Sequence, residues 1–123
     1  MAKVTGLGGV FYKVADPERT QRWYQEMLGI GGDYGATFRW ADDSDSAYSI
    51  FTPFKDDTGY FKPSEAPFMV NLRVDDLDAM VEMLAAKGVE TTGRQDEPYG
   101  RFAWIIDCDG IKIELWQQVG GAP

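Results

Sequence analysis

Glu114 is the residue whose type and position most suggest a chemical role. It lies in the segment IIDCDGIKIELWQQ (105–118). A tight turn is predicted at Asp109-Gly110, and after it apolar residues at positions 111, 113 and 115 alternate with Lys112, Glu114 and Trp116. This alternation predicts a strand that buries one face in a core. Glu114 then lies on the opposite face, where it could bind a metal, transfer a proton, bind a ligand or form a salt bridge.

Of these roles, ligand binding is favoured over catalysis. A carboxylate can act as a general base when burial raises its pKa. The sequence offers no partner acid, so Glu114 is the only catalytic candidate. As a ligand-binding group it would accept a hydrogen bond from a hydroxyl or ammonium group. A salt bridge to Arg73 or Lys13 stays open as the purely structural alternative.

Two other features are read as structural. Cys108 is the only cysteine, the chain has no histidine to act as its base, and two aspartates flank it, which disfavours a thiolate. The acidic run DDSDS (42–46) lacks the glycine and the distal glutamate of an EF-hand loop. We therefore predict an incidental cysteine and a solvated hairpin turn.

A faint internal repeat predicts the elements that position Glu114. The segments GVFYKVADPERTQRWYQEMLGI (9–30) and FMVNLRVDDLDAMVEMLAAKGV (68–89) each read as a strand followed by a helix. Asp16 caps the first helix and Asp75 or Asp76 the second, and Gly29 and Gly88 end them. Strand-like segments follow each copy, at 36–41 and 47–54, and at 89–93, 100–107 and 111–119. The order of strand, helix and further strands, twice over, predicts an α+β fold.

The chain resembles the vicinal oxygen chelate superfamily, which includes glyoxalases, extradiol dioxygenases and bleomycin resistance proteins. The segments that carry the resemblance are VADPERTQRWYQEMLGI, PFMVNLRVDDLDAMVEMLAAKGVE and YGRFAWIIDCDGIKIELWQ, which together span most of the chain. The resemblance implies one domain, 1–123, of two βαβββ modules (5–56 and 67–119). The modules would form a curved mixed β-sheet cup with the helices outside, and the chain would be a homodimer.

The resemblance also implies a small-molecule ligand in the cup. Strand parity and the curvature of the family place a mixture of aromatic and polar side chains there, as small-molecule pockets require. The predicted ligand-binding residues are Phe11, Tyr48, Thr52, Met69, Asn71, Arg73, Trp104, Glu114 and Trp116.

The metal site of metal-using relatives maps poorly onto this sequence. Its positions fall on Gly9, Thr52, Met69 and Glu114, and only Glu114 is a suitable ligand, whereas an open metal site needs about three protein ligands. We therefore predict no metal and no cofactor. The predicted function is metal-independent binding of a small molecule, as in the bleomycin resistance branch. The alternative is a glyoxalase-like lyase or isomerase, or a dioxygenase, with an atypical metal site.

Composition excludes several partners. The formal net charge is −8 at pH 7, so nucleic acid and anionic membrane surfaces would repel the protein. No apolar run approaches the roughly 20 residues of a membrane span. A single cysteine cannot form an internal disulfide, and we expect a cytoplasmic protein.

Overall fold

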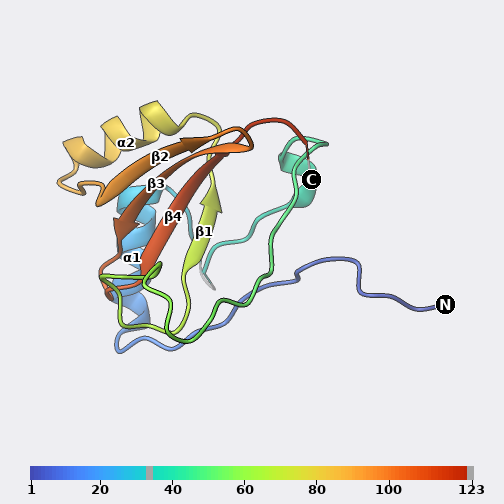
Figure 1. Cartoon of the computed structure of the whole chain (residues 1–123). Coiled ribbons are helices and arrows are strands. Elements are labelled where there is room, and N and C mark those ends of the chain that lie inside the picture. Colours follow the sequence, from blue (N-terminus) through green and yellow to red (C-terminus); the bar gives the residue numbers. More distant parts are fainter. Residues whose placement is uncertain (33–34, 122–123) are drawn as a thin grey trace.

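The computed structural model describes residues 1–32 and 35–121 (Figure 1). Its elements, in chain order, are α1 (Pro17–Leu28), the short 3₁₀ helix η1 (Trp40–Asp42), β1 (Val70–Arg73), α2 (Leu77–Ala86), β2 (Gly93–Glu97), β3 (Gly100–Ile106) and β4 (Lys112–Gln118). None of the described helices is long and apolar enough to span a membrane.

The sheet is mixed and has four strands in the order β1-β4-β3-β2. β1 runs parallel to β4, and the pairs β4–β3 and β3–β2 are antiparallel. The second half of the chain thus forms the predicted βαβββ unit, and the α+β fold is confirmed. The register sets Asn71 opposite Glu114 and Glu114 opposite Trp104.

Both helices begin where the sequence predicted. The Asp16 side chain accepts a hydrogen bond from the Arg19 amide at 3.2 Å, and the Asp76 side chain accepts one from the Ala79 amide at 3.1 Å. Gly29 ends α1 with φ at +68°, a left-handed conformation that glycine adopts without strain. These caps satisfy backbone groups that the helix ends would leave unpaired.

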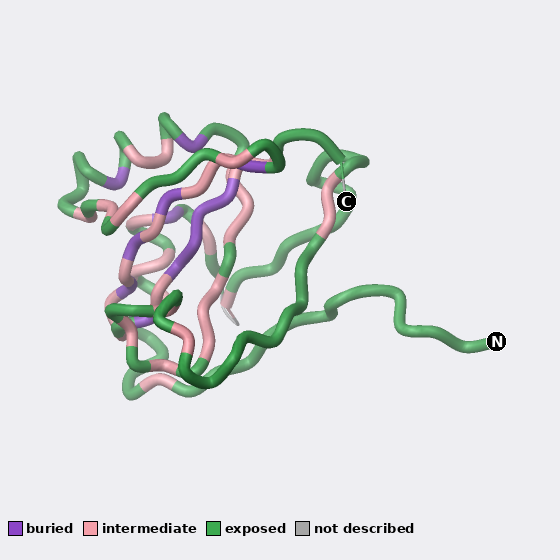
Figure 2. Tube along the Cα trace, in the orientation of Figure 1, coloured by how far each residue is buried: buried purple, intermediate pink, exposed green. Residues whose placement is uncertain are grey.

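The core lies between the sheet and the two helices. The largest fully buried side chains are Leu77, Leu84, Ile105, Ile113 and Leu115, and side chains of α1 and α2 pack against them. Figure 2 shows the buried residues gathered along β3 and β4. The odd positions of β4 face this core, so Glu114 and Trp116 lie on the other face of the sheet, as strand parity predicted.

The first half of the chain differs from the prediction. Within the described residues, the segments 10–14, 36–39 and 47–54 are not strands, and residues 40–42 form η1 instead. A strand needs the backbone of a neighbour to pair with, and in this single chain these segments have none. In Figure 1 the N-terminal segment runs away from the sheet. Within the described residues, the second module alone forms the mixed sheet, and irregular segments of the first half cross its open face, whereas both modules were expected to contribute strands to the cup.

The DCDG turn between β3 and β4 anchors α1 to the sheet. The Tyr24 hydroxyl donates to Asp107 at 2.5 Å, and the Thr20 hydroxyl donates to Asp109 at 2.5 Å. Asp107 is buried and also accepts from the backbone amides of Asp109 and Ile111. Burial, and then the bond to Asp107, raises the pKa of Tyr24 well above its usual value. The motif therefore has a structural role.

Cys108, in the same turn, is half-buried. Burial, and then the neighbouring Asp109 carboxylate, raises the pKa of its thiol. A raised thiol pKa disfavours the reactive thiolate, in agreement with the prediction of an incidental cysteine.

Candidate ligand-binding site

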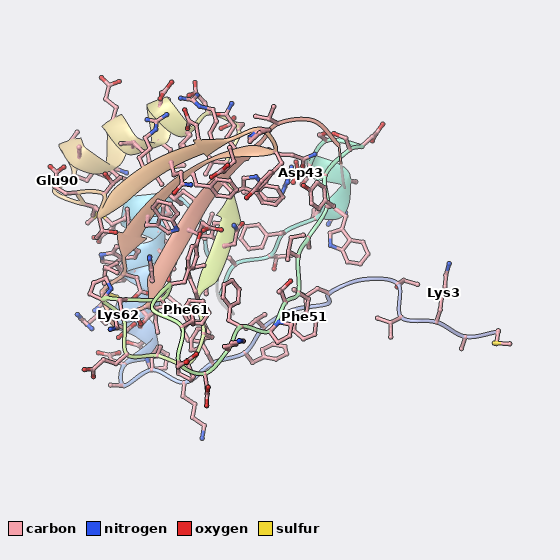
Figure 3. All side chains as sticks on the ribbon, viewed as in Figure 1. Lys3, Asp43, Phe51, Phe61, Lys62 and Glu90 are labelled. Atoms are coloured by element: carbon pink, nitrogen blue, oxygen red, sulfur yellow. The ribbon has the colours of Figure 1, made fainter. Side chains whose placement is uncertain are left out.

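The face of the sheet opposite the helices carries two rows of polar and aromatic side chains, and we call it the cup face. Across the strands, the first row is Asn71, Glu114 and Trp104, and the second is Arg73, Trp116 and Phe102. Figure 3 shows Asp43 at the end of the sheet where β1 and β4 finish, and Phe61 near the opposite end.

Glu114 is at the centre of the first row and only 8% exposed. Its Oε2 accepts hydrogen bonds from the Tyr60 hydroxyl at 2.5 Å and from the Trp104 indole at 2.8 Å. Its Oε1 accepts one from the Asn71 amide at 2.8 Å. A buried carboxylate is costly unless it is hydrogen-bonded, and here neutral donors occupy both oxygens. The group is therefore held in one position on the cup face.

Tyr60 comes from a segment without helix or strand, residues 55–65, which we call the Tyr60 loop. Its ring stacks on Phe54, with the centroids 5.6 Å apart, and meets the Trp104 ring edge-on at 6.1 Å. Burial, and then the hydrogen bond to Glu114, raises the pKa of the phenol. Tyr60 thus covers Glu114 while remaining 40% exposed itself.

Lys112, two residues before Glu114 on β4, brings a positive charge next to this row. Its ammonium nitrogen lies 5.1 Å from the centroid of the Tyr60 ring and donates to the Tyr60 carbonyl at 2.6 Å. Burial lowers the pKa of Lys112, and the Glu114 carboxylate partly opposes this shift. The lysine therefore holds the Tyr60 loop and does not form an ion pair with Glu114.

The second row is built around Trp116, which is only 4% exposed. The Arg73 guanidinium lies 5.0 Å from the centre of its indole, and the Tyr48 ring meets it edge-on at 5.2 Å. The Phe102 ring is parallel to the indole, with the centroids 6.2 Å apart. Because a β-carbon at Gly100 would collide with the indole nitrogen, glycine is required there.

Arg73 does not pair with Glu114, so that part of the prediction is wrong. Its Nε donates to Asp43 at 2.8 Å, and its Nη1 donates to Gln118 at 2.6 Å. The register explains the difference, because Arg73 lies opposite Trp116, one row away from Glu114. The hydrogen bond from Arg73 lowers the pKa of Asp43 and ties the acidic run 42–46 to the sheet.

Open space beside the cup face lies at the Arg73 end. Two open hollows of about 770 and 420 Å³ share Asp43, Ser44 and Arg73 in their walls, and Trp40 and Tyr48 line the smaller one. The acidic run 42–46 thus borders a hollow, rather than forming the predicted hairpin turn. At the other end of the face, the Tyr60 loop covers Glu114.

The structure brings most of the predicted ligand-binding residues together. Asn71, Trp104 and Glu114 form one row, Arg73, Trp116 and Tyr48 surround the next, and Met69 is half-buried directly before β1. Phe11, which is 97% exposed, and the exposed Thr52 stand apart, because their segments pair with no strand of this chain. Tyr60 was not predicted from the sequence, because it lies between the segment 47–54 and the second copy of the repeat, where no strand or helix is expected.

The donor set around Glu114 does not fit a divalent metal ion. Among the described residues, no three His, Cys, Asp or Glu side chains come close enough together to hold one. The groups that contact Glu114 are a phenol, an indole and an amide, whose hydrogens point at the carboxylate. A metal shell needs lone pairs at those places.

Comparisons with known proteins agree with this geometry. No family model and no curated protein matches the chain. Among solved structures, it is similar to TnmS3, an antibiotic binding protein from Streptomyces sp. CB03234, with 27% identity and a TM-score of 0.55 over 86% of this chain and 89% of that one. A glyoxalase/bleomycin resistance protein from the same organism gives 27% identity and a TM-score of 0.51 over 85% and 93%. These similarities support an assignment to the vicinal oxygen chelate superfamily.

The likeness extends over the whole fold of this superfamily. A glyoxylase/bleomycin resistance protein/dioxygenase domain from Frankia sp. EAN1pec matches 95% of this chain with 100% of its own length, at a TM-score of 0.58 and 19% identity. At that identity the match bears on the fold alone. This chain is a small α+β protein with a four-stranded mixed sheet and two helices, and its fold matches that of these neighbours.

Proposed function

We propose that the protein binds a small organic molecule on the cup face, without a metal, and that Glu114 accepts a hydrogen bond from a ligand hydroxyl or amine. The observation that carries the proposal is the position of Glu114. It is a buried carboxylate among aromatic rings, on the face that the helices leave uncovered. Aromatic side chains with a few fixed polar groups are the usual lining of small-molecule sites.

The comparison with TnmS3 supports the same class of function, because that protein is an antibiotic binding protein. We favour sequestration over catalysis, since Glu114 has no partner acid among the groups that contact it. We also propose a cytoplasmic location, in keeping with a chain that has a single cysteine.

A thermal-shift screen of antibiotics and aromatic metabolites tests this function. We expect some of them to stabilise the wild-type protein, because a ligand that binds only the folded state raises its stability. Glu114→Gln should weaken the binding of such ligands by about tenfold, since a hydrogen bond to a charged group is replaced by a neutral one. The matched control is Glu90→Gln, which alters an exposed glutamate far from the cup face in Figure 3 and should leave binding unchanged. Equal losses in both variants would contradict the proposed role of Glu114.

The purified protein should contain no stoichiometric divalent ion. The reason is the donor set around Glu114, which offers hydrogens where a metal needs lone pairs. Elemental analysis of protein purified without chelators measures this directly. Zinc, nickel, iron or manganese at one ion per chain, lost on Glu114→Gln, would instead support the alternative of a lyase or dioxygenase.

We also propose that the protein is a homodimer. β1 is at the edge of the sheet, and the apolar segments around Phe11 and Phe51 are exposed. Open strand edges and exposed apolar strand-forming segments favour pairing with another chain. Light scattering at micromolar concentration should therefore give twice the chain mass of 13.8 kDa. A mass equal to one chain under the same conditions would refute the dimer.

A further inference from the structure

The phenol that donates a hydrogen bond to Glu114 in this structure is a side chain of the protein itself. The Tyr60 phenol donates to the buried carboxylate at 2.5 Å, between the Phe54 and Trp104 rings and beneath the Lys112 ammonium. An aromatic hydroxyl compound would need the same features from a binding site: an acceptor for its hydroxyl, aromatic walls and a cation near its ring. The Tyr60 side chain therefore occupies the place on the cup face that such a compound would take.

The hydrogen bonds that attach the Tyr60 loop to the sheet depend on this one residue. In the part of the chain that the structure describes, both hydrogen bonds between the loop and the sheet involve Tyr60, one through its hydroxyl to Glu114 and one from Lys112 to its carbonyl. The remaining hydrogen bonds of the loop are local, such as those from the amides of Thr58 and Lys62 to Lys55 and Gly59. Few hydrogen bonds to the sheet and partial exposure are features of segments that open locally at low cost.

We propose that Tyr60 is a displaceable internal ligand, whose phenol occupies the position at Glu114 that the hydroxyl of an aromatic ligand takes when the Tyr60 loop opens. This inference rests on the proposed function and adds to it a ligand class and a competing residue. A ligand that binds only the open form has its apparent affinity reduced by the fraction of molecules that are open. Removal of the internal competitor should therefore strengthen binding.

The test uses 4-methylphenol, which has the structure of the tyrosine side chain, and toluene, which lacks the hydroxyl. Both are titrated by NMR into the wild type, Tyr60→Ala, the double variant Tyr60→Ala with Glu114→Gln, and Asp57→Ala. Asp57→Ala is the control, because it changes an exposed residue of the same loop that has no hydrogen bond or ion pair to Tyr60.

We expect Tyr60→Ala to bind 4-methylphenol at least about tenfold more tightly than the wild type, which is the gain if about one molecule in ten is open. Toluene should bind much more weakly than 4-methylphenol, the double variant should lose the gain, and Asp57→Ala should resemble the wild type. Binding of 4-methylphenol to Tyr60→Ala that is no tighter than to the wild type would overturn the inference.

A second variant covers the case in which Tyr60→Ala does not fold. Tyr60→Phe keeps the ring and removes only the hydroxyl, so amide hydrogen exchange in residues 55–65 should become faster while exchange in β3 is unchanged. Unaltered exchange in the loop would count against the inference. If screened ligands bind the wild type through Glu114 but Tyr60→Ala shows no gain, only this inference fails. If Glu114→Gln has no effect on any ligand, the proposed function fails with it.

Discussion

Asp107→Ala should lower the free energy of unfolding by roughly 3 kcal/mol, because each buried donor left without a partner costs about 1–3 kcal/mol. The Asp107 side chain is 6% exposed and accepts from the Tyr24 hydroxyl and from the backbone amides of Asp109 and Ile111. Its removal would leave these donors without a partner and would remove one of the bonds that hold α1 to the turn between β3 and β4, while the bond from Thr20 to Asp109 remains. Urea unfolding followed by tryptophan fluorescence measures the loss.

The matched control for this variant is Asp57→Ala, at an exposed position in the Tyr60 loop. Exposed substitutions of this kind usually change stability by less than about 0.5 kcal/mol. Tyr24→Phe should cost roughly 1 kcal/mol, since it removes one of the three bonds to Asp107. A loss for Asp107→Ala as small as that of the control would show that the turn does not anchor the helix.

Trp116→Ala should also destabilise the fold, by about 3 kcal/mol or more, as buried tryptophan truncations do. Strand parity alone suggested that this change would leave the fold intact, because the core face of β4 is untouched. The structure shows instead that the indole is 4% exposed and packed between Arg73, Tyr48 and Phe102. The cup face therefore has a packed layer of its own.

Thermal and urea unfolding of Trp116→Ala and Trp40→Ala test this point. Trp40 is exposed in η1, so its truncation should be nearly neutral. A wild-type stability for Trp116→Ala would mean that the indole is not packed. Ligand binding to Trp116→Ala is best compared with Trp116→Phe, which keeps an aromatic ring and separates lost stacking from lost stability.

The second half of the fold could be predicted from the sequence because its signals are local. The Asp76 cap, the alternation along β4 and the turn at Asp109-Gly110 depend only on neighbouring residues. Alternation also places Glu114 and Trp116 on one face, whatever the rest of the chain does. The register across β1, β4 and β3 then brings Asn71 and Trp104 to Glu114.

The contacts that the sequence did not predict are long-range. Tyr60 reaches Glu114 across 54 residues of chain, and Arg73 reaches Asp43 across 30. No periodicity links such positions, because loops bring them together. The expected strand at residues 10–14 failed for a related reason: alternation indicates that a segment can be a strand, but a strand forms only where another strand's backbone is available.

The central claim, that a ligand binds on the cup face at Glu114, is tested most directly by the indole signals of the four tryptophans in a ¹H–¹⁵N NMR spectrum. The Trp104 indole donates to Glu114, whereas Trp23 lies on α1, against the core on the helix side of the sheet. On addition of a ligand found by the thermal-shift screen, we predict that the Trp104 signal moves most and the Trp23 signal stays in place. A ligand that shifts Trp23 or Trp40 while Trp104 is unchanged would contradict the account.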